Sequence, residues 1–174
     1  MNNNLPKYID DLLEIDKADG CFKTLYGQKF LIYNDEDVIV LQSDIQAKIK
    51  LENYEDIFLD GTFFSDPKCI YQILIIRVNL KHSNKYATTG FALCKNKTEK
   101  LYRLIIYEIN KNLNAIGGKI FKPNNIHIDF EIALSNAIIN IWNYCQIRYC
   151  LFHFQQIIER KRKKFIYLQQ RNRS

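Results

Sequence analysis

The chain has 174 residues, 47% hydrophobic and 25% charged, a balance typical of a globular domain with its own core and too apolar for a disordered chain. No run approaches the roughly 18 consecutive apolar residues of a membrane span, and the first ten residues lack the pattern of a signal peptide. We therefore expect an intracellular protein that does not insert into a membrane. Five scattered cysteines without a CxxC pair favour reduced thiols over a disulfide framework.

The net charge of +6 is unevenly distributed along the chain. Residues 1–59 carry 6 Lys/Arg against 12 Asp/Glu (−6), residues 60–159 carry 12 against 7 (+5), and residues 160–174 carry 7 against none (+7). A basic body that keeps a few aspartates on apolar segments suggests a polyanionic partner and bound cations. The alternative for the basic end is a solvated helix terminus that binds nothing.

The first half of the chain predicts one helix followed by strands. Apolar residues at helical spacing predict a short amphipathic helix over residues 5–15. Residues 29–33 and 38–41, joined by the turn sequence NDED, predict a hairpin. Segments rich in β-branched and aromatic residues predict three further strands, at 54–64, 70–80 and 85–94. Because short polar turns separate these three strands, we expect an antiparallel meander.

A long helix follows the meander. Thr98 is its expected N-cap, and Gly117-Gly118 lies just beyond its expected end. Its apolar face is predicted to consist of Leu101, Leu104, Ile105, Tyr107, Ile109 and Leu113.

The remaining residues alternate between strand and helix. We predict a strand at 125–130, a helix at 131–144, a strand at 146–152 and a basic helix at 153–171. Strands that alternate with helices pair in parallel, beside the antiparallel meander. The sequence thus predicts an α/β fold with a mixed sheet flanked by helices. We expect residues 1–55 to lead into the core as a helix and hairpin, and residues 56–174 to form the core.

Two aspartates stand out because each is predicted at the end of a strand. Asp60 ends the first strand of the meander in "IFLDGTFF", and Asp129 ends the strand in "NIHIDF". If these strands are neighbours, the two carboxylates face each other at the sheet edge where such folds bind ligands. The pair would repel unless it were protonated or held a cation such as Mg²⁺. The alternative for either residue alone is a turn or a helix N-cap, and Asp129 directly precedes a predicted helix.

Four blocks of sequence together resemble the Mutator-like element (MULE) transposase domain. They are "FLDGTFFSDPKCIYQILII", "FALCKNKTEKLYRLI", "IHIDFEIALSNAI" and "CLFHF", in the family's order, covering residues 57 to about 160. The resemblance implies a ribonuclease H-like catalytic core with a DDE carboxylate triad, two Mg²⁺ or Mn²⁺ ions and DNA as substrate. It assigns Asp60 and Asp129 as the first two carboxylates, and Cys150 and His153 as the family's C(2)H element.

The resemblance also carries expectations about activity and assembly. It implies hydrolytic nicking at the ends of a transposable element followed by strand transfer, a nuclear location, and a possible homo-oligomer on the element ends. The family's third carboxylate is a glutamate far beyond the C(2)H element, and Glu159 lies too early to match it. We therefore expect a core that is incomplete at its C-terminal side. The alternative function is a non-catalytic remnant that binds nucleic acid or a partner.

Other candidate ligands are weighed against structural roles. Cys150 and His153 supply only two ligands of a tetrahedral zinc site, and Cys145 becomes a third only if the backbone turns back between strand and helix, so we do not expect zinc. His127 alternates with Asp129 and so shares its face, and Glu131 at a helix start favours the positive end of the helix dipole. The expected contacts to DNA phosphates, or a nuclear localisation patch, are Arg160, Lys161, Arg162, Lys163 and Lys164.

Overall fold

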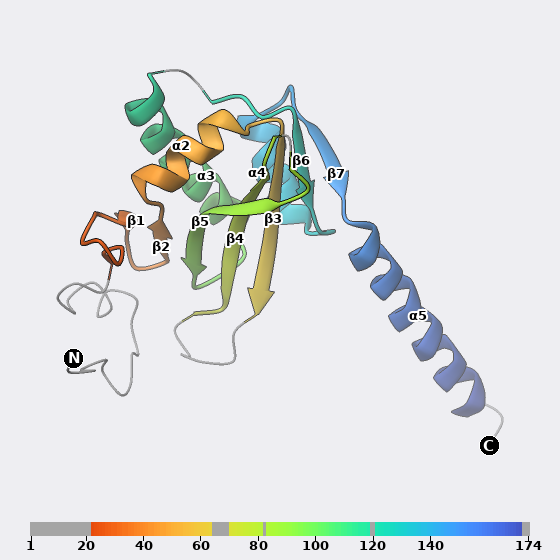
Figure 1. The fold of residues 1–174 in the computed structure, drawn as a ribbon. Coiled ribbons are helices and arrows are strands. Elements are labelled where there is room, and N and C mark those ends of the chain that lie inside the picture. Colours follow the sequence, from red (N-terminus) through yellow and green to blue (C-terminus); the bar gives the residue numbers. More distant parts are fainter. Residues whose placement is uncertain (1–21, 64–69, 82, 119–120, 172–174) are drawn as a thin grey trace.

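The computed structural model describes residues 22–63, 70–81, 83–118 and 121–171. They form a seven-stranded sheet in the order β1-β2-β5-β4-β3-β6-β7 (Figure 1). The strands are β1 (Leu31–Asn34), β2 (Val38–Leu41), β3 (Asp56–Phe63), β4 (Gln72–Asn79), β5 (Tyr86–Cys94), β6 (Asn125–Ile128) and β7 (Gln146–Tyr149). The helices are α2 (Asp44–Glu52), α3 (Glu99–Gly117), α4 (Ile132–Ile141) and α5 (Leu151–Arg171). The helix expected at residues 5–15 lies outside the described residues.

The pairing of the strands confirms the mixed sheet. β1 and β2 form the predicted hairpin, and β3, β4 and β5 form the predicted antiparallel meander. β6 pairs in parallel with β3, and β7 pairs in parallel with β6. The β-α-β order of the second half explains this geometry, since a helical crossover returns the chain to the same end of the sheet.

Helices α2, α3 and α4 share one core with one face of the sheet. Alternate residues of β3, Ile57 and Leu59, are buried in this core, as are Ile126 and Ile128 of β6. Because side chains alternate between faces, the residues between them point to the opposite face, which these helices leave open.

The start of α3 is as predicted, and its end lies one residue later than predicted, because Gly117 is still helical. The Thr98 side chain accepts a hydrogen bond from the backbone N–H of Leu101, and Gly118 adopts the left-handed conformation that ends the helix. The predicted apolar face is wrong at Tyr107, which is 59% exposed. Tyr102 is buried instead, because its hydroxyl finds polar partners from two other elements.

The differences from prediction include a missed helix and an early strand end. Helix α2 was not predicted, although Ser43 and Gln46 form a capping box at its start. The last strand ends at Tyr149 rather than continuing through Phe152, because Leu151 already begins α5.

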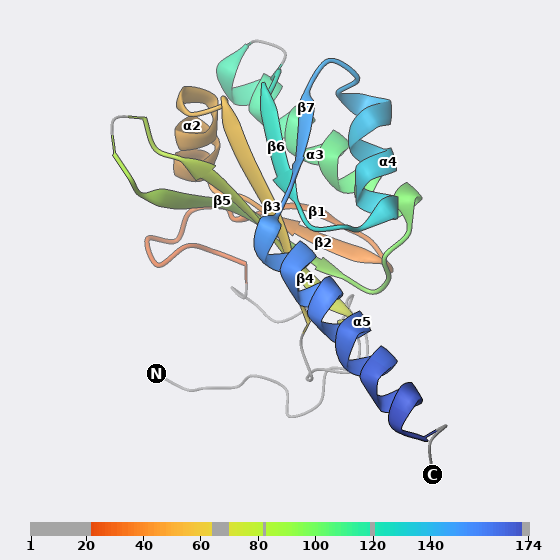
Figure 2. The same cartoon turned by 90° about the vertical axis from the view of Figure 1, so that its right-hand side faces the viewer.

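Helix α5 leaves the body of the protein at the end of β7 and points away from it (Figures 1 and 2). Its first turn is held by Phe154, whose ring lies 5.5 Å from that of Phe130, while Phe130 stacks on Tyr149 at 4.7 Å. Phe152 in the same turn is exposed, and apolar residues such as Ile158 and Phe165 are exposed farther along the helix. No helix in the described ranges has both the length and the apolar character that crossing a membrane requires.

Candidate active site

The register between β3 and β6 places the two predicted aspartates side by side. Asp56, Ile57 and Phe58 pair with Asn125, Ile126 and His127, a constant offset of 69 residues. Continuing this offset by two residues sets Asp60 opposite Asp129. Both side chains lie on the open face of the sheet, since they alternate with the buried Leu59 and Ile128. The condition set in the sequence analysis, that the two strands are neighbours, is therefore met, and the pair lies together.

Asp60 does not end its strand, as the sequence had suggested. It pairs with Ile75 of β4, and the ladder continues through Phe63. A Cβ at Gly61 would lie 2.9 Å from Oε1 of Gln72, so glycine provides room for the Gln72 side chain beneath the sheet.

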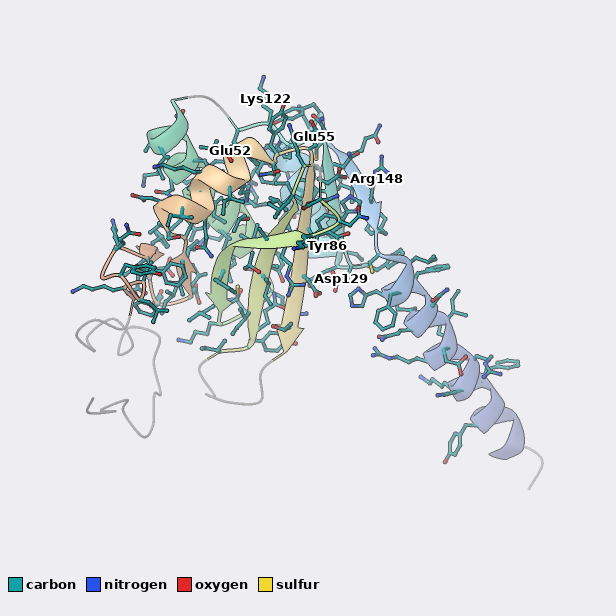
Figure 3. The ribbon with its side chains drawn as sticks, viewed as in Figure 1. Glu52, Glu55, Tyr86, Lys122, Asp129 and Arg148 are labelled. Atoms are coloured by element: carbon teal, nitrogen blue, oxygen red, sulfur yellow. The ribbon has the colours of Figure 1, made fainter. Side chains whose placement is uncertain are left out.

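A pocket of about 270 Å³ opens over the two aspartates. Figure 3 shows Asp129 beside the sheet, with Tyr86 just above it. The pocket is lined by Phe58, Leu59, Asp60, Arg77, Tyr86, His127, Ile128, Asp129, Cys150 and His153. These residues come from β3, β4, β5 and β6, from the positions just after β6 and β7, and from the first turn of α5. The fold thus gathers the acidic pair and the Cys150/His153 motif into one site.

Electrostatics in the pocket disfavour a second negative charge. Burial, and then the nearby carboxylate of Glu131, raise the pKa of Asp129, and Asp60 raises it further. His153 and Lys97 act in the opposite direction. A divalent cation between the two aspartates would relieve this repulsion.

Glu131 belongs to a separate polar network on the helix side of the sheet. The hydroxyl of Tyr102 donates to Oε1 of Glu131 at 2.5 Å and accepts from Nε2 of Gln72 at 2.5 Å. Lys97 lies 3.4 Å from Oε2 of Glu131. Glu131 also occupies the N-cap position of α4, although its side chain makes no capping bond. Asp129 is therefore not the N-cap of this helix, and its carboxylate stays in the pocket.

Cys150 and His153 line the pocket, but Cys145 is not among the lining residues. Cys145 precedes β7 and Cys150 follows it, which separates them by roughly 16 Å at the rise of an extended strand. This geometry does not assemble the three-ligand zinc site considered above. Nδ1 of His153 is buried without a hydrogen-bond partner among the described residues.

Asp60 and Asp129 suit a metal ion that takes its remaining ligands from water and substrate. In the ranges that the structure covers, no three His, Cys, Asp or Glu side chains are grouped closely enough to hold a metal by themselves. Mg²⁺ commonly binds one or two carboxylates and takes its other ligands from water and substrate phosphates. Asp60 and Asp129 fit that pattern.

The predicted basic segment lies on α5, away from the pocket. Arg160 is nine residues into the helix, about 14 Å along its axis from Leu151. Arg162 and Lys163 pair with Glu159, at 2.8 and 3.8 Å. Lys161 and Lys164 are exposed and have no ionic partner in the described part of the chain. Glu159 is thus engaged on the helix surface and does not line the pocket.

Besides the core residues Leu59 and Ile128, sequence reasoning missed three residues of the pocket: Phe58, Arg77 and Tyr86. Each lies on a different strand, and they meet only through the register of β3, β4 and β5. The available signal in the sequence was alternation along the predicted strands, which places these side chains on the face opposite to the buried one.

Fold and site together define an α/β protein with an acidic pair on neighbouring parallel strands of a mixed sheet. A sequence model described as the MULE transposase domain matches residues 57–157, more than half of the chain. The chain belongs to this family, and it contains a transposase-type domain. The match begins just before Asp60 and ends just after His153, so it includes every lining residue of the pocket.

Two further comparisons were made. No curated protein is similar enough in sequence to count as a match. Among solved structures, a chain in the cryoEM structure of the simian T-cell lymphotropic virus intasome in complex with PP2A regulatory subunit B56 gamma is similar, with a TM-score of 0.36 and 13% identity. The similarity covers 76% of this chain and 40% of that one, so this chain spans less than half of its length.

Proposed function

We propose that Asp60 and Asp129 bind Mg²⁺ or Mn²⁺ and that the domain cuts and joins phosphodiester bonds of DNA. The observation that carries this proposal is the in-register acidic pair at the floor of one pocket, in a chain of the MULE transposase family. The expected reactions are hydrolytic nicking at an element end and strand transfer into target DNA.

The residues of the pocket have distinct roles in this proposal. Asp60 and Asp129 supply oxygen ligands from two adjacent strands, which keeps them at a fixed spacing. His153 opposes the negative charge on Asp129 and so helps to keep its carboxylate ionised. Divalent cations at such a site stabilise the attacking and leaving oxygens of a phosphodiester.

A third carboxylate is not contributed by the described residues. Glu131 is bound to Tyr102 and Lys97, and Glu159 is paired with Arg162. Two carboxylates alone would bind a divalent cation weakly. We therefore expect cleavage to need millimolar concentrations of Mg²⁺ or Mn²⁺.

The test is nicking of supercoiled plasmid by the full chain with Mg²⁺, Mn²⁺ or EDTA. We expect slow nicking that requires the metal and is lost in Asp60→Asn and in Asp129→Asn. Asp44→Asn is the matched control, since Asp44 is exposed on α2. Nicking that persists in both pocket variants, or in EDTA, would refute the proposal.

A second candidate is a domain that binds DNA without cutting it. The exposed basic segment of α5 favours it, with Lys161 and Lys164 free of ionic partners in the described ranges. Binding of this kind would fall as salt rises. It would also weaken in Lys161→Gln/Lys164→Gln and ignore Asp60→Asn. We further propose that the same segment directs the protein to the nucleus, which fluorescence microscopy of a tagged double variant tests.

A further inference from the structure

A row of cationic and aromatic side chains crosses the open face of the sheet beside the acidic pair. Phe58 of β3 is paired with Arg77 of β4 on one side and with His127 of β6 on the other, and His127 is paired with Arg148 of β7. Residues paired across strands point to the same face. These four side chains therefore form one row over four strands. The sequence alone did not bring them together as a group.

The aromatic members of the row are held in place by one another. The rings of Phe58 and His127 stack at 4.2 Å with an interplanar angle of 13°. Nε2 of His127 lies 2.8 Å from Oδ1 of Asp56, which fixes the imidazole orientation. Tyr86 of β5 meets Phe58 edge-on at 5.0 Å and remains 60% exposed. Tyr86 is thus a supported aromatic ring with a free surface over the pocket.

The row and the acidic pair belong to one continuous site. Asp60 and Asp129 follow Phe58 and His127 by two residues on the same strands, which places them about 7 Å farther along the same face. The pocket of about 270 Å³ includes members of both sets. Figure 3 shows Tyr86 close to Asp129, with Arg148 on β7 beyond them.

We propose that this row, which we call the stacking row (Phe58, Arg77, Tyr86, His127 and Arg148), holds an unpaired nucleobase of a DNA strand whose phosphate lies at Asp60 and Asp129. The base stacks on Tyr86, and the guanidinium groups of Arg77 and Arg148 lie beside the flanking phosphates. The proposal rests on the proposed function, because it takes the acidic pair as the position of a phosphate.

The chemistry of the site favours this occupant. A single strand offers π-faces and negative charges in alternation, which aromatic rings flanked by cations recognise without reading sequence. Bases in a duplex are stacked on their neighbours and do not present a free face to Tyr86. The stacking row therefore predicts that the site accepts a strand whose bases are unpaired next to the cleavage point.

The test measures affinity for a short dye-labelled DNA single strand by fluorescence anisotropy, with the full chain carrying Asp60→Asn and Asp129→Asn in EDTA, so that no cleavage occurs and no uncompensated carboxylate repels the phosphate. We expect Tyr86→Ala to weaken this binding by about 5- to 150-fold, and Tyr86→Trp to preserve it. Tyr107→Ala is the matched control, because Tyr107 is similarly exposed, at 59%, but lies on α3 outside the pocket.

The binding of other nucleic acids separates the possible outcomes. Duplex DNA of the same sequence should lose much less affinity on Tyr86→Ala. Equal losses for duplex and single strand, no loss for either, or tighter binding of the matching RNA strand would overturn the proposal. Tyr86-dependent binding of a single strand without any metal-dependent nicking would instead refute the proposed function and retain the base site.

Discussion

Lys50 on α2 provides the sharpest test of the energetics of the fold. Its side chain is 1% exposed, and burial lowers the pKa of its amine from 10.5 to about 7. The ring of Phe121 lies 5.3 Å from its Nζ, which favours the charged form and offsets part of this cost. We expect Lys50→Met, which keeps the length of the side chain, to stabilise the protein.

The magnitude follows from the shift in pKa. A lowered pKa means that the folded state takes up the proton less readily than the unfolded state, so stability falls as pH decreases from 10.5 towards 7 and is constant below that range. A shift of this size is worth about 4 kcal/mol at pH 7, at 1.36 kcal/mol for each pH unit. Subtracting about 2 kcal/mol for the desolvated cation–π contact leaves an expected stabilisation of roughly 2 kcal/mol.

Urea unfolding of the wild type and of Lys50→Met at several pH values measures this effect. The difference in unfolding free energy should be largest near pH 7 and fall below about 1 kcal/mol by pH 10. Lys48→Met on the exposed side of the same helix is the control and should change little. If Lys50→Met destabilises the protein, or if the difference in unfolding free energy does not vary with pH, the reasoning is refuted. Other interactions would then compensate for the burial of the amine.

Three further predictions concern the site and its surroundings. Gly61→Ala should destabilise the protein by about 1–3 kcal/mol, because the new Cβ would lie 2.9 Å from the Gln72 amide. Gly27→Ala is the comparison in urea unfolding, since no atom lies within 4 Å of its new Cβ but its φ is +73°. The two variants separate the cost of crowding from the cost of backbone strain. Ser43→Ala should lose about 1 kcal/mol in urea unfolding through the capping box of α2, and Ser43→Asp should not. Since the pKa of Asp129 is raised, wild-type stability should decline as pH rises above the ordinary aspartate range, and Asp129→Asn should lack that decline; an unchanged pH profile would contradict the electrostatics of the pocket.

The sequence predicted the elements that carry a local signal. The alternation in β3 to β5, the N-cap at Thr98 and the left-handed Gly118 are all readable in short windows, and the structure confirms them. The β-α-β order also predicted parallel pairing in the second half of the chain, and the structure shows that the strands of Asp60 and Asp129 are neighbours in it. The acidic pair could be proposed for that reason.

The features that were missed depend on contacts between distant residues. Tyr102 is buried because Gln72 and Glu131 satisfy its hydroxyl, which no helical periodicity reveals. Asp60 was expected at a strand end, whereas pairing with β4 carries the strand through Phe63. The stacking row needs the register of five strands at once, so it emerges only from the folded sheet.

The backbone holds the two aspartates with unequal firmness. Asp60 lies inside a ladder of seven residue pairs with β4, whereas Asp129 lies just past the last residue of β6, on the link to α4. Amide protons around Asp60 should therefore exchange with deuterium only when the sheet opens, and those around Asp129 should exchange through small local openings. The carboxylate of Asp60 would then keep a fixed position, and that of Asp129 could adjust its position as a substrate binds.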